Sequence, residues 1–385
     1  MSKRKICFVT GTRADYGLIR PVIKEVEQKA NMDVSIIVSC MHLSKEFGYT
    51  VEEIKKDGFK IEAELSTNPL GDSEFDMAMT VGVGIVEIAK AYQNMKPDIV
   101  VLLGDRIEML SAAITAGYMN IAIAHMHGGD ISGNIDDCSR HSITKFAHLH
   151  LAATKKSAER IIKMGEEPWR VHIVGAPGID SILNHKFKSK QEVCKELGLD
   201  GKKKILLVSQ HSVTSQAESA SKQIRETLEA VKDFDNSDSQ IIVIYPNSDA
   251  GGRQIIKQIE EYEKRGCIKV YKSLEHDIYL DLLKNADVLV GNSSSGVIEA
   301  ASFSLPVINI GIRQKGREKT VNVIDVPHDK EAIKNALKKS LSANFRKKIM
   351  NIKNPYGDGK TAQRIAKLLA EIKINNELLQ KRITY

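Results

Sequence analysis

The sequence predicts an α/β protein made of two Rossmann-like domains with a cleft between them. Short apolar runs rich in β-branched residues alternate with amphipathic helical stretches along most of the 385 residues. The alternation pauses at the turn GAPG, residues 175–178, and then resumes. Because strand–helix–strand alternation implies right-handed crossovers and parallel pairing, each half of the chain is expected to form its own sheet, covered on both faces.

The apolar runs give the expected strands. They span residues 5–10, 33–39, 99–103, 121–125, 149–153 and 172–174 in the first half, and 204–209, 240–245, 268–271, 288–290 and 306–310 in the second. Helical patterns lie between them, for example over 18–29, 75–95 and 107–116. We therefore place a first domain at residues 1–175, a second at 176–358, and a helical tail at 359–385 that packs back on the first domain.

Composition narrows the class of protein. The chain is 42% hydrophobic and 27% charged, as in globular proteins, and no stretch is long and apolar enough to span a bilayer. The net charge of +7 is dispersed in patches such as KKK at 202–204, without interleaved aromatic residues. Such patches favour solvated faces over nucleic-acid binding, and we expect neither a nucleic-acid nor a membrane partner.

Cysteine usage points to a reducing compartment. The five cysteines lie far apart and form no CxxC pair. This pattern predicts reduced thiols, a cytoplasmic protein and no zinc site.

A candidate phosphate site lies in the second half. The segment GNSSSG, residues 291–296, follows an apolar strand and opens a helical pattern. Free N–H groups and the positive end of a helix dipole favour an anion there, and the hydroxyls of Ser293 and Ser294 can add hydrogen bonds. Glu299, one turn further, could hold ribose hydroxyls. A tight turn that caps a helix is the simpler alternative for this stretch alone.

Charged residues also follow the strands of the first half, at the sheet edge where open α/β sheets bind ligands. The first strand ends in GTRADYG, which places Arg13 and Asp15 in the first loop of the cleft. Arg13 suits a phosphate because its planar fork can bind two oxygens. An N-cap aspartate beside a surface arginine is the alternative. Asp105 and Arg106 follow the strand at 99–103.

Polar residues are densest between His125 and His141, in HMHGGDISGNIDDCSRH. His-x-His with carboxylates is a plausible metal ligand set, but no matching ligand motif occurs elsewhere, so we expect no metal. Acid–base chemistry fits better. Asp136 and Arg140 share a helix face at i and i+4, so the guanidinium could orient the carboxylate, or the two could simply stabilise the helix.

Further polar residues follow the strands of the second half. His211 comes after the strand at 204–209, Asn247 after that at 240–245, and Arg313 after that at 306–310. His211 could bond a phosphate, and Arg313 could reach across the cleft. Each could equally be an ordinary loop residue.

Several of these motifs together resemble the UDP-N-acetylglucosamine 2-epimerase family, in particular its hydrolysing branch. They are GTRADYG, GDR, HMHGGDISGNIDDCSRHSITK, QHSVT, YPNSDAGG, GNSSSG with Glu299, and INIGIRQKGRE, in order along nearly the whole chain. The resemblance implies the glycosyltransferase-B fold, no cofactor, and a homodimer or homotetramer.

The resemblance also implies roles for the candidate residues. The acid–base groups would be Asp105, His127, Asp130 and Asp136, with Arg140 beside them. The substrate-binding set for UDP and sugar would be Arg13, Asp15, His42, Arg106, His141, His211, Asn247, Ser293, Ser294, Glu299 and Arg313. His127 departs from some hydrolysing members, which carry a glutamate there, and the HVEAGLR pattern of non-hydrolysing epimerases is missing.

The activity implied by the resemblance converts UDP-N-acetylglucosamine and water to N-acetylmannosamine and UDP, through 2-acetamidoglucal, for sialic acid synthesis. The ISGNIDD and YPNSDAGG stretches favour this substrate. The alternative is the same reaction on UDP-N,N'-diacetylbacillosamine, on the way to legionaminic acid. A glycosyltransferase of the same fold and a nucleotide-sugar sensor are further alternatives, although several carboxylates beside an anionic ligand argue against a sensor.

Overall fold

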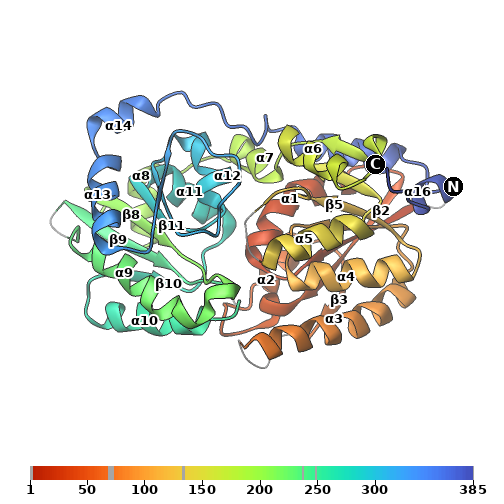
Figure 1. The fold of residues 1–385 in the computed structure, drawn as a ribbon, viewed down its shortest axis with the longest axis horizontal. Helices are drawn as coiled ribbons and strands as arrows, with labels where there is room; N and C mark the ends of the chain where they lie inside the picture. Colours follow the sequence, from red (N-terminus) through yellow and green to blue (C-terminus); the bar gives the residue numbers. More distant parts are fainter. Residues whose placement is uncertain (1–2, 68–72, 132–134, 236–237, 248, 385) are drawn as a thin grey trace.

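The computed structural model contains two parallel β-sheets, each covered by helices, with a cleft between them (Figure 1). It describes residues 3–67, 73–131, 135–235, 238–247 and 249–384. Both sheets have the strand order of doubly wound folds: β3-β2-β1-β4-β5-β6-β7 in the first and β10-β9-β8-β11-β12-β13 in the second. The predicted fold class is confirmed.

The first sheet is formed by the strands up to residue 173. Its strands are β1 (Arg4–Thr10), β2 (Met32–Ser39), β3 (Ile61–Leu65), β4 (Ile99–Leu103), β5 (Ala122–Met126), β6 (Leu149–Ala152) and β7 (Val171–Ile173). The helices around it are α1 (Arg13–Glu27), α2 (Val51–Lys56), α3 (Glu74–Met95), α4 (Ile107–Tyr118), α5 (Ile135–Phe146) and α6 (Lys155–Lys163), with 3₁₀ turns η1 (Cys40–Leu43) and η2 (Pro168–Arg170).

The second sheet follows helix α7 (Pro177–Asn184). Its strands are β8 (Lys204–Ser209), β9 (Ser239–Ile244), β10 (Lys269–Tyr271), β11 (Val288–Gly291), β12 (Val307–Ile310) and β13 (Val323–Val326). Its helices are α8 (Lys190–Glu196), α9 (Ala220–Lys232), α10 (Gly252–Lys264), α11 (His276–Asn285), α12 (Ser295–Ile298), α13 (Lys330–Ser340) and α14 (Ala343–Lys348), with η3 (Thr214–Ser219) and η4 (Ala300–Phe303).

The predicted strands match the structure to within one or two residues, but β3 and β13 were missed. Both are edge strands, with the sequences IEAEL and VIDV and mostly half-exposed side chains. The carboxylates of Glu62, Glu64 and Asp325 interrupt the apolar positions of these two strands, so a search for continuous apolar runs overlooks them.

Two local predictions were wrong. Helix α1 begins at Arg13, not at residue 18, because Thr12 and Asp15 form a capping box, so Arg13 and Asp15 lie in its first turn and not in a loop. The helical pattern over 361–379 is two helices, α15 (Thr361–Glu371) and α16 (Asn376–Leu379). The chain is extended at Ile372, and Asn375 caps the second helix with its side chain.

The last helices pack on the first sheet. Ile365, Ala366 and Leu369 of α15 and Leu378 of α16 belong to the same buried cluster as Ile6 of β1 and its neighbours. Figure 1 shows α16 on the side of the first sheet, far from the second, and Arg4 of β1 donates to the carbonyls of Leu369 and Ala370 at the end of α15. The chain therefore crosses between the two sheets twice.

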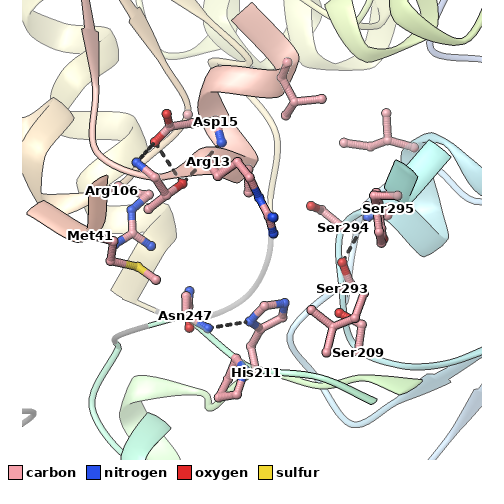
Figure 2. A pocket seen from close by; sticks show the side chains of 18 of the residues that line it. Arg13, Asp15, Met41, Arg106, Ser209, His211, Asn247, Ser293, Ser294 and Ser295 are labelled. Atoms are coloured by element: carbon pink, nitrogen blue, oxygen red, sulfur yellow. Dashed lines mark hydrogen bonds between the residues drawn. The ribbon is translucent and has the colours of Figure 1, made fainter. Parts of the chain in front are cut away.

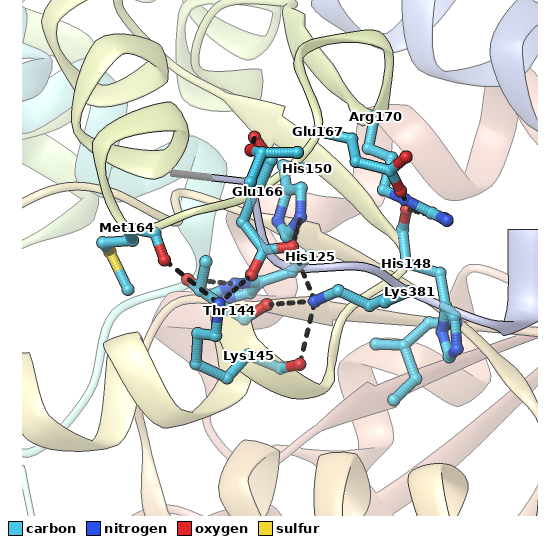
Figure 3. A network of polar contacts seen from close by, with 12 residues as sticks. His125, Thr144, Lys145, His148, His150, Met164, Glu166, Glu167, Arg170 and Lys381 are labelled. Atoms are coloured by element: carbon cyan, nitrogen blue, oxygen red, sulfur yellow. Dashed lines mark hydrogen bonds and ion pairs between the residues drawn. The ribbon is translucent and has the colours of Figure 1, made fainter.

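A buried polar cluster joins this returning segment to the first sheet (Figure 3). The Glu166 carboxylate, 1% exposed, lies 2.6 Å from Lys145 Nζ, 3.0 Å from His150 Nε2 and 2.7 Å from Lys381 Nζ. Burial raises the pKa of Glu166, but its hydrogen bonds with these three residues outweigh burial and lower the pKa from 4.5 to about 2.

Glu166→Gln is expected to lower the free energy of unfolding at pH 7 by about 3 kcal/mol, the equivalent of a pKa of about 2 against 4.5. A depressed carboxyl pKa stabilises the fold above pH 4.5, and this contribution disappears as the pH falls toward 2. The difference in the free energy of unfolding between the variant and the wild type should therefore decrease below pH 4.5. Urea unfolding at pH 7 and pH 3.5 measures it, with exposed Glu371→Gln as control. A gap that stayed constant with pH would contradict the assignment.

Candidate functional site

The cleft between the sheets contains a cavity of about 290 Å³, at the carboxyl ends of the strands of both. Its lining includes most of the residues predicted from sequence: Arg13, Asp15, Asp105, Arg106, His127, Asp136, Arg140, His211, Asn247, Ser293, Ser294, Glu299 and Arg313. Asp130, His42 and His141 are outside this lining. Residues 132–134 and 248, which belong to two of the quoted motifs, lie outside the described residues.

Arg13 enters the cavity from the first turn of α1 (Figure 2). Asp15 holds this turn in place: its carboxylate accepts hydrogen bonds from the N–H groups of Gly11 and Thr12, at 3.2 and 3.0 Å, and from the Thr10 hydroxyl. Burial raises the pKa of Asp15 to about 6. Asp15 therefore fixes the first turn of α1, from which Arg13 enters the cavity.

His42 lies behind this wall. It is fully buried, with one ring nitrogen 3.0 Å from Thr10 Oγ1 and the other 2.8 Å from Thr50 Oγ1. Burial lowers the pKa of His42 to about 3, so the ring is neutral at pH 7. In this structure both of its nitrogens are used within the protein.

The second sheet supplies His211 and the serine turn on the opposite wall (Figure 2). The Asn292 side chain accepts from the N–H of His211 at 2.7 Å and donates to its carbonyl at 2.9 Å, which locks the two loops together. His211 Nδ1 accepts from the N–H of Asn247 at 3.1 Å. Burial lowers the pKa of His211 to about 3, so the neutral ring carries its proton on Nε2 and can donate it to an oxygen in the cavity.

The serine turn differs in one respect from the prediction. Its helix α12 has only four residues and passes into the 3₁₀ turn η4, so the dipole of a long helix is missing here. What remains is a turn of hydroxyl groups, with Ser293, Ser294 and Ser295 lining the cavity and Glu299 buried beside them. Burial raises the pKa of Glu299.

Arginines gather around the cavity without enough carboxylates to pair them all. Arg317, which the sequence analysis did not single out, lines the cavity, and its buried Nε and Nη1 have no hydrogen-bond partner in the described part of the chain. Arg313 lies close enough that Arg317 and burial both lower its pKa. Burying a cationic group whose hydrogen bonds are not all satisfied costs free energy. The part of the cavity around Arg313 and Arg317 is therefore suited to an anionic ligand.

Carboxylates and a histidine form the remaining wall, at the ends of β4 and β5 and on α5. The guanidinium of Arg140, 1% exposed, contacts the Asp105 carboxylate, Asp137 Oδ1 at 2.6 Å and the carbonyl of Asp130 at 2.9 Å. Sequence spacing had pointed to Asp136 as the carboxylate that Arg140 orients. The structure adds Asp105, which lies on a different element.

His127 adopts a left-handed backbone with φ of +61°, an unfavourable conformation for a residue with a side chain. Its Nδ1 lies 3.5 Å from Asp130 Oδ2, and Ser157 Oγ donates to Asp130 Oδ1 at 2.6 Å. Burial raises the pKa of Asp130, but His127, Arg317 and Ser157 together bring it below its usual value. His127 Nε2 has no hydrogen-bond partner among the described residues, so this nitrogen is available to a ligand while Nδ1 faces the Asp130 carboxylate.

Glu108 and Tyr279 are further residues that the sequence analysis missed. Glu108 lies outside the cavity lining, and its Oε1 accepts a hydrogen bond of 2.9 Å from Nε of Arg106, which lines the cavity. Tyr279 lines the cavity from α11. Arg317 could have been found, since it lies in the quoted motif INIGIRQKGRE. Glu108 and Tyr279 face inward from ordinary helices, and no local pattern distinguishes them.

Ion pairs connect the first half of the chain to the second half around the cleft. Arg106 lies 3.4 Å from Asp249, Arg253 3.2 Å from Glu46, and Lys56 3.2 Å from Glu275. Helices α1 and α11 also pack closely against each other. At their contact, a Cβ added to Gly17 would lie only 2.4 Å from the His276 ring. The two sheets are thus in contact around the cavity.

No metal site or membrane span is found in the described residues. No group of three or more His, Cys, Asp or Glu side chains there is arranged to hold a metal ion. No helix within the described ranges has the length and apolar character needed to cross a bilayer.

The fold is the α/β fold of the glycosyltransferase-B type, and its cavity is lined by arginines, His211 and serine hydroxyls together with carboxylates and His127. A family model described as UDP-N-acetylglucosamine 2-epimerase matches residues 24–370. The chain belongs to this family, and it is a hydrolysing UDP-sugar 2-epimerase.

Relatives support this assignment. The chain is 41% identical, over 98% of both chains, to the hydrolysing UDP-N,N'-diacetylbacillosamine 2-epimerase of Legionella pneumophila. It is 36% identical to the hydrolysing GDP/UDP-N,N'-diacetylbacillosamine 2-epimerase of Campylobacter jejuni, over 84% of this chain and 85% of that protein. It is 34% identical to polysialic acid biosynthesis protein P7 of Escherichia coli, over 92% and 90%.

A solved structure shows the same fold. The crystal structure of UDP-GlcNAc 2-epimerase from Neisseria meningitidis bound to UDP-GlcNAc superposes with a TM-score of 0.79 at 18% identity, covering 96% of this chain and 100% of that one. At this level of identity the likeness concerns the fold alone.

Gly291→Ala is expected to lower the free energy of unfolding by about 3 kcal/mol and to weaken UDP binding. Gly291 has φ of +134°, and an added Cβ would lie 2.0 Å from the carbonyl oxygen of Ser209, so the strand that carries the serine turn must shift. Thermal unfolding and calorimetric titration with UDP measure both effects. Gly58→Ala is the control, since Gly58 has φ of +79° with open space around it. Equal losses in both variants would contradict the clash.

Proposed function

We propose that this chain is the hydrolysing 2-epimerase of UDP-N,N'-diacetylbacillosamine. It would convert this nucleotide sugar and water to UDP and the free C2 epimer, 2,4-diacetamido-2,4,6-trideoxymannose. The observation that carries the proposal is the 41% identity to the Legionella pneumophila enzyme over 98% of both chains. The sequence analysis preferred UDP-N-acetylglucosamine, and the relatives favour its alternative.

The lining of the cavity favours a substrate whose sugar has apolar substituents. Met41, Phe47 and Leu103 line the cavity on the first-domain side. Diacetylbacillosamine has a methyl group at C6 and an acetamido group at C4, where N-acetylglucosamine has hydroxyl-bearing substituents. An apolar lining offers the methyl groups contacts that it cannot offer to hydroxyls.

In the proposed reaction, elimination is followed by hydration. A base removes the C2 proton while the C1–O bond breaks, UDP leaves, and a C1=C2 double bond forms. Water then adds at C1, and a proton returns to C2 from the opposite face. Asp105, Asp136 and His127 are the proposed acid–base groups, and Asp130 and Arg140 orient them.

Because the C2 proton is not acidic, the elimination is expected to depend mainly on stabilisation of the departing UDP. Arg13, the Nε2–H of His211, and the hydroxyls of Ser293 and Ser294 are proposed to hold the diphosphate. Arg313 and Arg317 add positive charge, and Glu299 holds the ribose. Closure of the cleft would keep the unsaturated sugar bound while water is admitted.

UDP-N-acetylglucosamine is the second candidate substrate. The 34% identity to the E. coli polysialic acid protein and the 31% identity to the Neisseria meningitidis UDP-N-acetylglucosamine 2-epimerase favour it. The two candidates share every step and differ only at C4 and C6.

NMR of the purified protein in D₂O with each nucleotide sugar tests the proposal. We expect free UDP and the deuterated C2 epimer from UDP-N,N'-diacetylbacillosamine, at a kcat/KM at least about 10-fold above that with UDP-N-acetylglucosamine, as a well-matched methyl contact can give. Deuterium at C2 reports the elimination. The opposite preference would move the assignment to the second candidate, and no UDP release from either would refute both.

In the same assay Asp105→Asn and Asp136→Asn are expected to reduce turnover by roughly 10²-fold or more, as loss of an acid–base group does. UDP binding should stay within a few-fold of wild type, because both residues come from the first sheet and its helices, whereas His211 and the serine turn belong to the second. Calorimetric titration with UDP checks binding. Full activity in both variants would remove them from the mechanism.

We also propose that the protein is a homodimer formed through α3. Phe75, Met79, Val83 and Val86 make an exposed apolar stripe along this helix, with Phe75 72% exposed. Figure 1 shows α3 at the outer edge of the first domain. Antiparallel packing of two such helices would set the acidic first turn of one, with Glu74 and Asp76, against the end of the other that carries Lys90.

Val83→Glu is expected to convert the dimer to a monomer, because it places a charge in the centre of the stripe. Light scattering coupled to gel filtration measures the mass. Val321→Glu, at an exposed position of the second domain, is the matched control and should leave the dimer intact. A wild-type protein that is monomeric at micromolar concentration would refute the proposed interface.

A further inference from the structure

The segment that follows α16 returns to the helices that carry the acid–base groups. Lys381 Nζ donates to the carbonyl oxygens of Thr144 and Lys145, at 3.2 and 2.8 Å, in addition to its 2.7 Å ion pair with Glu166 (Figure 3). Those carbonyls are in the last turn of α5, where carbonyls have no partner within the helix. A lysine there satisfies them and complements the helix dipole.

The same cluster also holds the end of α6. Lys145 Nζ donates to the carbonyl of Met164 at 3.1 Å and pairs with Glu166, both in the turn after α6. Lys145, Glu166 and Lys381 thus tie the carboxyl ends of α5 and α6 to each other. We refer to these three residues as the α5–α6 clamp.

The position of Lys381 is fixed on both sides along the chain. Before it, Arg170 donates to the carbonyls of Glu377 and Leu378, at 2.6 and 2.7 Å. After it, the N–H of Thr384 donates to the carbonyl of Gly165 at 2.9 Å. The Lys381 side chain is only 16% exposed, so it is not a loosely attached surface lysine.

The opposite ends of both helices support the catalytic wall. Helix α5 carries Asp136 and Arg140, and Arg140 contacts Asp105. The first turn of α6 supplies Ser157, which bonds Asp130 beside His127. A second connection runs through Thr144 Oγ1, which lies 3.4 Å from His125 Nδ1, while His125 Nε2 donates to the carbonyl of Gly104, next to Asp105, at 2.7 Å.

We propose that Lys381 is a positioning residue for the epimerisation: by holding the carboxyl ends of α5 and α6 in the clamp, it fixes the place of Arg140, and through Arg140 that of the Asp105 carboxylate. Lys381 lies outside the cavity lining, so its proposed effect on the reaction is transmitted through α5 and α6. The inference rests on the proposed roles of Asp105 and Asp136.

The test compares Lys381→Met, which keeps the length of the side chain and removes its charge and donors, with Lys381→Arg. We expect Lys381→Met to lower kcat by about 10-fold or more, with KM and UDP affinity within about 3-fold, because small misplacements of reacting groups have effects of this size. Lys381→Arg should keep most of kcat. Lys367→Met, on the exposed face of α15, is the matched control and should behave as wild type.

Two readouts distinguish positioning from stability. The kcat is calculated per UDP-binding site, by calorimetric stoichiometry, so unfolded protein does not lower it. Hydrogen exchange of the amides at residues 136–140 should be faster in Lys381→Met than in wild type. A variant that melts at a lower temperature but keeps wild-type kcat per site and wild-type exchange would overturn the inference.

The exchange measurement also separates this inference from the proposed function. If the wild-type protein turned over neither nucleotide sugar, the proposed function would fail. Faster exchange at residues 136–140 in Lys381→Met would then still support the clamp, and unchanged exchange would refute it.

Discussion

The wall of the cavity that carries the proposed acid–base groups depends on one buried cation, Arg140. Its guanidinium is almost fully enclosed, and a charge in that position is tolerable only when it is paired and hydrogen-bonded. The partners come from three places: Asp105 after β4, the backbone at Asp130 after β5, and Asp137 on α5 itself. One side chain therefore joins two strand ends and a helix, and its loss would leave the carboxylates of Asp105 and Asp137 without this partner.

The opposite wall is organised in the reverse way. There the backbone is held by neutral contacts, such as the two hydrogen bonds of Asn292 to His211, and the arginines are only partly satisfied: Arg313 donates to the Asn292 carbonyl at 3.3 Å, but other buried guanidinium nitrogens have no partner among the described residues. Arg317 illustrates this, with two buried nitrogens that no described group satisfies. A diphosphate would supply the missing hydrogen-bond acceptors. The free protein therefore has unpaired positive charge in the cavity that the proposed ligand would neutralise.

The sequence was sufficient for the fold and for the position of the cleft, because both depend on local signals. Buried parallel strands such as β4 are continuous apolar runs, and the polar residues that follow them, Asp105 and Arg106, must lie at one sheet edge. Edge strands β3 and β13 were missed because acidic residues interrupt their apolar positions. The contact of Arg140 with Asp105 was also missed, since it joins residues 35 positions apart on different elements. Tyr279 carries no local signal, as its orientation depends on how α11 packs.

The double crossing of the chain has a consequence for synthesis in the cell. The core of the first domain includes Ile365, Leu369 and Leu378, which the ribosome makes only after the whole second domain. During translation the second sheet can therefore complete its core first, while the first sheet, although begun earlier, waits with an uncovered face of α1. This uncovered surface is exposed to chaperones and to aggregation until the last helices emerge. A nascent chain stalled before residue 361 would carry a finished second sheet beside a first sheet whose core is incomplete.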